Sequence, residues 1–152
     1  MQETKELVDV NKVLRQVIDV LHDGHEGMME IEKHLKDESA KHFFQRESQV
    51  RAEYAAELEN ELHRLGQHDV KEGGTASGSI HRAWGEIQAH LGAGDHGLLA
   101  TAEQGEDAAK KVYEKALEEK MPGDVRDLLQ AQQKHIIEAH NKVRDLRDSK
   151  AA

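Results

Sequence analysis

The chain has 152 residues and a formal net charge of -9 with histidine neutral, and this acidic balance argues against binding to nucleic acid or to an anionic membrane surface. Aromatic residues make up only 3%, which disfavours a β-sandwich or barrel, whereas 34% charged residues with abundant Ala, Glu, Lys, Leu and Gln favour long helices. There is no cysteine, so disulfides, thiol nucleophiles and cysteine-based metal sites are excluded.

We expect a single cytoplasmic domain over residues 1–152. The N-terminal residues lack a basic region followed by an apolar run, and no stretch approaches the roughly 18 apolar residues of a membrane span. Eleven histidines would change the formal charge from -9 to +2 if all were protonated, so the surface potential depends on pH between about 5 and 7. A pH-responsive protein is therefore one hypothesis.

The first predicted helix covers residues 4–36. Its apolar positions recur at steps of three and four, which is typical of a helix facing a bundle core. These positions are Val10, Leu14, Val17, Leu21, Met28, Ile31 and Leu35. The letters KDES at 36–39 end this helix, and Ser39 is the predicted N-cap of the next one.

Three more long helices follow. The second is predicted over 39–65 and ends at Gly66, a residue that favours the left-handed backbone of a helix stop. A connection over 66–95 contains a short helix at 79–91, whose Trp84 we expect to anchor it onto the bundle. The third helix covers 96–120, and the fourth covers 122–148 after the break MPGD.

The lengths of the connections predict the topology. The two tight breaks make each helix pair an antiparallel hairpin, while the long connection can run the length of a bundle, because 13 helical residues span about 20 Å. Two hairpins joined by one long crossover is the ferritin-like arrangement. The sequence therefore predicts an all-α, ferritin-like four-helix bundle.

Glycines interrupt the predicted helices at core positions. Gly24 and Gly27 lie within VLHDGHEGMMEIEKHL, and Gly105 lies on the apolar stripe of the third helix. Each glycine costs a helix about 1 kcal/mol relative to alanine. Such positions permit close helix packing or leave room for a large neighbouring group, and a polar pocket at mid-bundle is the functional alternative.

Several separate motifs together resemble a bacterial ferritin-like four-helix-bundle family of unknown function. They are LHDGHEGM with its DGxxG pattern, ELHRLG, SGSIHRAW, the RGED-like EQGEDAAKKVYEKAL, and AHNKVRDLRD, in the expected order over about 10–148. The resemblance implies a ferritin-like bundle and little about activity. Related ferritin-like families bind two irons, store iron or detoxify peroxide, and those activities require the ligands.

The ligand pattern of a di-iron bundle is incomplete in this sequence. Such a site takes a Glu from each of two helices and Glu-x-x-His from each of the other two, and no Glu-x-x-His occurs. By a faint internal repeat, Glu53 occupies the Glu position of the second helix and His140 the His position of the fourth. The remaining candidate ligands near mid-bundle are Glu103, Glu106, His25 and Glu47.

These residues leave two readings open, a buried hydrogen-bond cluster or a site for one iron or zinc ion. The leading hypothesis is a non-catalytic bundle protein without a cofactor, stress-associated, acting as a homodimer or by binding a protein partner. The alternative is a metal-binding or redox protein with an atypical mid-bundle site. That alternative requires Glu53 and His140 to be buried close together.

Overall fold

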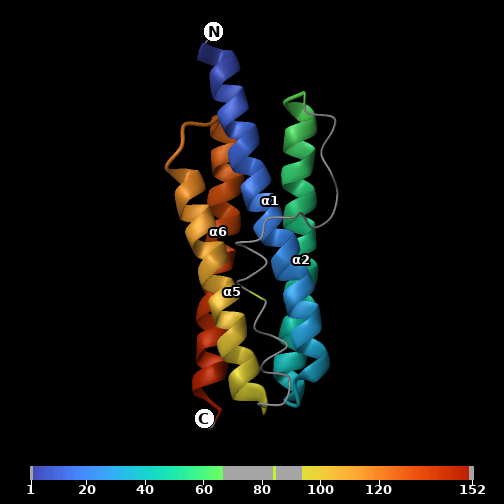
Figure 1. Cartoon of the computed structure of the whole chain (residues 1–152). Coiled ribbons are helices and arrows are strands. Elements are labelled where there is room, and N and C mark those ends of the chain that lie inside the picture. Colours follow the sequence, from blue (N-terminus) through green and yellow to red (C-terminus); the bar gives the residue numbers. More distant parts are fainter. Residues whose placement is uncertain (1, 67–83, 85–93, 151–152) are drawn as a thin grey trace.

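A computed structural model describes residues 2–66, 84 and 94–150, with side chains described from Val10 onward (Figure 1). The described residues form four helices, α1 (Gln2–His34), α2 (Glu38–Arg64), α5 (Gly94–Leu117) and α6 (Gly123–Asp148), and contain no strand. The prediction of an all-helical bundle is thus confirmed, with boundaries shifted by one to three residues. The predicted short helix at 79–91 lies outside the described residues except for Trp84.

The helix ends show how the chain turns between helices. Asp37, rather than the predicted Ser39, is the N-cap of α2, because its carboxylate accepts a hydrogen bond from the backbone N–H of Ala40 at 2.8 Å. Ser39 instead donates its hydroxyl to Asp37 at 2.7 Å, which lowers the pKa of Asp37. The predicted stop at Gly66 is present, with a φ of 93° that favours glycine.

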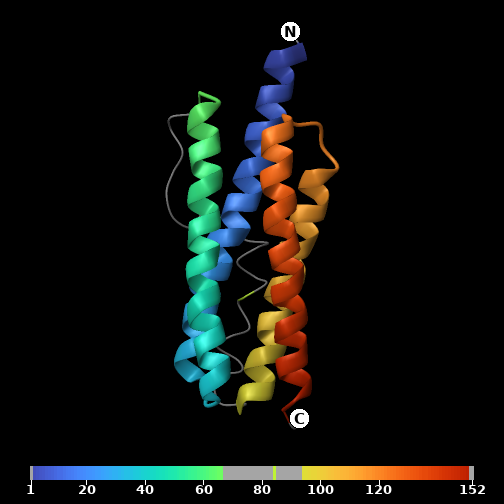
Figure 2. The ribbon, with the colours of Figure 1, turned by 180° about the vertical axis from the view of Figure 1, so that it is seen from behind.

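Contacts between helix ends fix the direction of each helix. The carboxylate of Asp95, at the start of α5, accepts the backbone N–H groups of Lys36 and Asp37, each at 2.9 Å, in the turn between α1 and α2. Arg64, at the end of α2, pairs with Asp124 at the start of α6. The end of α2 and the start of α5 therefore lie at opposite ends of the bundle, as both views show (Figures 1 and 2).

The core consists of two apolar clusters separated by a polar layer. One cluster takes residues from Val10 to Leu21 of α1 and from Ala55 to Leu62 of α2, together with the facing parts of α5 and α6. The other lies towards the turn between α1 and α2 and contains Met28, Ile31, Leu35, Ala40, Phe44, Trp84, Leu98, Leu99, Ala102 and Val143. Between them lie the buried polar residues Asp23, Glu47, Ser48, Arg51, Glu106 and His140. We call this set the central polar layer.

Gly24, Gly27 and Gly105 lie near this central level and make room for large side chains. A Cβ atom added at Gly27 or at Gly105 would overlap the indole of Trp84, so the ring sits in a slot between α1 and α5. A Cβ at Gly24 would lie 3.3 Å from Nη1 of Arg51, which is tight. The helix-propensity cost of Gly27 and Gly105 is therefore offset by burial of the indole of Trp84, which is 6% exposed.

No helix in the described ranges combines the length and the apolar character that crossing a bilayer requires.

We predict that Gly27→Ala and Gly105→Ala each destabilise the fold by about 1 to 3 kcal/mol, because the new methyl group displaces the indole from a packed slot. Urea denaturation measures the change, and the emission of Trp84, the single tryptophan, shifts to the red if the ring is expelled. Gly123→Ala is the matched control, since a Cβ there meets open space at a helix start. Equal stability of all three variants would contradict the slot.

Candidate functional site

Arg51 stands at a core position of α2. Phe44 lies seven residues before it and Leu58 seven residues after it, and all three side chains are fully buried. A spacing of seven returns to nearly the same face of a helix, so Arg51 points where the apolar stripe points. The apolar residues of α2 alone do not reveal Arg51, because it is a charged residue on the same stripe.

The guanidinium of Arg51 joins two buried carboxylates from different helices. Its Nε donates to Glu47 on α2 at 3.1 Å, and its Nη2 donates to Glu106 on α5 at 2.6 Å. Desolvation opposes a buried charge, but Glu106 and Glu47 outweigh it and hold the pKa of Arg51 above its usual value. Arg51 therefore stays charged in the centre of the bundle.

Glu106 is the carboxylate of this group whose charge is least well compensated. Burial raises the pKa of Glu106 above its ordinary value, although Arg51 acts in the opposite direction. Its Oε1 is buried without a hydrogen-bond partner among the described residues, and so is Nη1 of Arg51. Two carboxylates share one guanidinium here, so the group carries an excess negative charge unless a proton or a neighbouring cation balances it.

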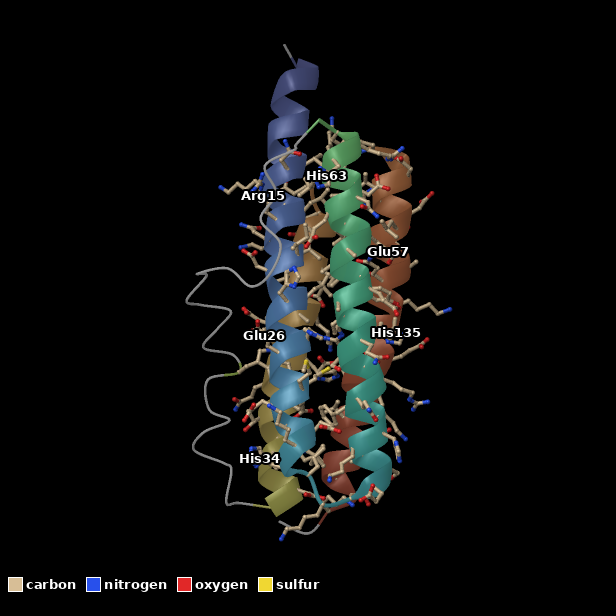
Figure 3. All side chains as sticks on the ribbon, turned by 90° about the vertical axis from the view of Figure 1, so that its right-hand side faces the viewer. Arg15, Glu26, His34, Glu57, His63 and His135 are labelled. Atoms are coloured by element: carbon tan, nitrogen blue, oxygen red, sulfur yellow. The ribbon has the colours of Figure 1, made fainter. Side chains whose placement is uncertain are left out.

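His135 of α6 connects this buried group to solvent. Its Nε2 lies 2.9 Å from both carboxylate oxygens of Glu47, and its side chain is 35% exposed. The ring also meets Tyr54 edge-on at 5.6 Å between centroids. His135 and Glu57 lie on the side where α2 and α6 face each other (Figure 3). The imidazolium of His135 can supply the balancing positive charge at the rim of the layer.

A separate polar contact forms between α5 and α6. Nε2 of His140 lies 2.7 Å from Asp107 and 3.9 Å from Glu103, and Glu103 also pairs with Arg147. His140 is therefore buried against the carboxylates of Asp107 and Glu103, and Arg147 also engages Glu103. A guanidinium at that carboxylate competes with a metal ion for the same lone pairs.

The six candidate ligands do not converge on one point. Glu47 and Glu106 meet through Arg51, His140 and Glu103 meet near Asp107, and Nδ1 of His25 binds the backbone oxygen of Ser48 at 2.7 Å. Glu53 is exposed, so the expected burial of Glu53 beside His140 is wrong. The repeat alignment assigned Glu53 to the core, whereas the packed face of α2 runs through Arg51 and Ala55.

No set of three or more His, Asp or Glu residues in the described ranges is arranged to hold a metal ion.

A second buried hydrogen-bond chain lies beside the central polar layer. The hydroxyl of Tyr113 donates to Gln132 at 2.8 Å, and the amide of Gln132 donates to Glu57 at 3.1 Å and to the backbone oxygen of Tyr54. Burial raises the pKa of Tyr113, so its hydroxyl remains a donor. Together with Arg51, this chain links α2, α5 and α6 by specific polar contacts rather than by a reactive group.

The comparisons with known proteins identify a family but no activity. The model of the family described as a domain of unknown function, DUF2383, matches residues 9–119, more than two thirds of the chain. No curated protein matches the chain.

We predict that Arg51→Met destabilises the fold by about 3 to 5 kcal/mol at pH 7, because it leaves Glu47 and Glu106 buried without their cation. The pKa of Glu106, already raised, rises further without Arg51, so the folded chain holds this proton more tightly than the unfolded chain. Stability of the variant is therefore regained as pH falls through that raised pKa. Urea denaturation at pH 7 and pH 5 measures both effects.

The matched double variant Arg51→Met with Glu106→Gln removes one of the two uncompensated charges. It should recover part of the loss at pH 7 and show a weaker dependence on pH. A single variant that is as stable as the wild type at pH 7 would contradict the central role of the ion pair.

Proposed function

The chain belongs to the DUF2383 family, a domain of unknown function, and from its buried contacts we propose that it is a non-catalytic helical-bundle protein that acts by self-association or by binding a protein partner. The observation that carries this proposal is the guanidinium of Arg51 between Glu47 and Glu106. An arginine there supplies the positive charge that a metal ion would supply, and it leaves no open coordination position for a reaction.

We also propose that the bundle has the ferritin-like order of helices. Its support is the placement of the end of α2 and the start of α5 at opposite ends of the bundle. The cation in the centre distinguishes the chain from bundles that hold two metal ions between carboxylates and histidines. The stress association expected from the sequence stays a prediction.

The surface favours polar rather than apolar contacts with a partner. Among the described residues, the large hydrophobic side chains that are exposed are Met29 on α1 and Ile137 on α6, which are isolated from each other in the sequence and on different helices. Single exposed side chains of this kind are normal on a protein surface. A homodimer or a hetero-complex of this chain would therefore depend on charged contacts, which salt weakens.

We predict that iron or zinc bound after loading and desalting does not depend on the central carboxylates. Glu47→Gln and Glu106→Gln should retain the same metal content as the wild type by elemental analysis, because Arg51 already occupies these carboxylates. Glu30→Gln, an exposed carboxylate on α1, is the control for surface scavenging. Near-stoichiometric metal that both central substitutions abolish, and that the control retains, would overturn the proposal in favour of a metal-binding protein.

We predict a homodimer by light scattering coupled to gel filtration, with twice the 17.1 kDa mass of the chain at low salt and a lower average mass at high salt. The concentration of the eluted peak is varied to separate association from shape. A monomer at every concentration and salt level would rule out self-association and leave a different protein as the partner.

A further inference from the structure

A groove between α1 and α2 lies at the surface beside Ser48 of the central polar layer, and it contains a histidine with a defined free nitrogen. The groove has a volume of about 360 Å³ and is lined by side chains that include His25, Met29 and Glu32 of α1 and Gln49 of α2. Nδ1 of His25 lies 2.7 Å from the backbone oxygen of Ser48. A carbonyl oxygen only accepts hydrogen bonds, so Nδ1 carries the proton and Nε2 of the neutral ring carries the lone pair.

Anchoring of one ring nitrogen by a carbonyl is the arrangement that orients metal-binding histidines. The hydrogen bond fixes the tautomer and the plane of the ring, and it makes the other nitrogen a stronger electron-pair donor to a metal ion. In the described part of the chain, Nε2 of His25 has no hydrogen-bond partner that would occupy this lone pair. The lone pair on Nε2 of His25 is therefore available to an electrophile or a metal ion.

The thioether sulfur of Met29 supplies a second metal-ligand atom on the same face of α1. It follows His25 by four residues, a spacing that places the two Cβ atoms about 6 Å apart on one face of a helix. Met29 is 45% exposed and lines the groove, whereas its neighbour Met28 is fully buried in the core. The side chain of Met29 is therefore accessible in the same groove that His25 lines.

The donor types select the ion. A thioether sulfur and a neutral imidazole nitrogen are soft and borderline ligands that favour Cu(I), whereas magnesium and calcium require several oxygen ligands. Glu32 and Lys33 both line the groove, and the ammonium group of Lys33 lies 3.4 Å from the carboxylate of Glu30, which offsets its positive charge. We propose that the groove between α1 and α2 binds one monovalent copper ion through Nε2 of His25 and the sulfur of Met29.

This site is independent of the proposed function, because it shares no ligand with the ion pairs of Arg51. Copper binding in the groove would add a metal-dependent property to a bundle whose centre is occupied by a guanidinium. His25 was expected among the mid-bundle ligands, and the proposal places it instead in a surface groove next to Ser48.

The test is competition for Cu(I) between the purified full chain and a chromophoric Cu(I) chelator, under reducing conditions without oxygen. We expect the wild type to bind close to one ion per chain, and Met29→Leu and His25→Gln each to weaken the binding by about tenfold or more. Met121→Leu, at a partly buried methionine of the other hairpin, and His42→Gln, at an exposed histidine of α2, are controls that should bind as the wild type does.

A second measurement keeps the result clear if His25→Gln disturbs the fold. X-ray absorption at the copper edge should show a sulfur neighbour in the wild type and in Met121→Leu, and no sulfur neighbour in Met29→Leu, an exposed and nearly isosteric change. Binding that is unaltered by Met29→Leu, that falls equally in the controls, or that shows no sulfur neighbour in the wild type would overturn the proposal.

Discussion

The ion pairs of Arg51 are the constraint on which the rest of the bundle depends. A charge with no exposed surface is tolerated only with close partners of opposite sign, and Arg51 has two, Glu47 on its own helix and Glu106 on α5. The closest helix pairs are α1 with α2, α5 with α6, and α1 with α5. Arg51 reaches from α2 across the core to α5, so its long side chain ties one hairpin to the other at mid-height.

Three glycines near the central polar layer leave space for two large buried side chains. Protein interiors are packed at nearly constant density, so a fully buried arginine and a tryptophan require missing volume on the facing helices. Gly24 gives that volume to Arg51, and Gly27 and Gly105 give it to Trp84. The glycines that weaken α1 and α5 as isolated helices thus permit the two largest side chains of this level to be buried.

The central polar layer is joined by ion pairs between helices, with Arg51 at its centre. His135 contacts Glu47 at the exposed edge of the layer, and the buried His140 contacts Asp107. In the described ranges, no three His, Asp or Glu side chains are arranged to hold a metal ion. The side chains that we propose as copper ligands lie instead on the surface, where a backbone carbonyl oxygen holds the ring of His25 and Met29 lines the same groove. The buried polar groups specify how the helices align, which is a role that buried ionic groups have in other bundles.

The sequence by itself determined the helices, because the steps of three and four between apolar residues record which face of each helix is buried. Every position of the predicted α1 stripe, from Val10 to Leu35, is buried. The two short connections also determined the two hairpins. The sequence also contained the evidence that Arg51 is buried, since it lies seven residues from both Phe44 and Leu58. A charged residue on an apolar stripe does not, however, reveal which residue it pairs with.

Only the tertiary structure decided what the central residues do. Glu106 and Arg51 are 55 positions apart, and the pairing of a buried charge depends on which helix lies opposite, a property that no local spacing contains. Glu53 faces solvent because the packed face of α2 runs through Arg51 and Ala55, each two residues away on a helix that turns by 100° per residue. The glycines were visible in the sequence, but the side chains that fill their space come from other helices, and the fold alone brings them together.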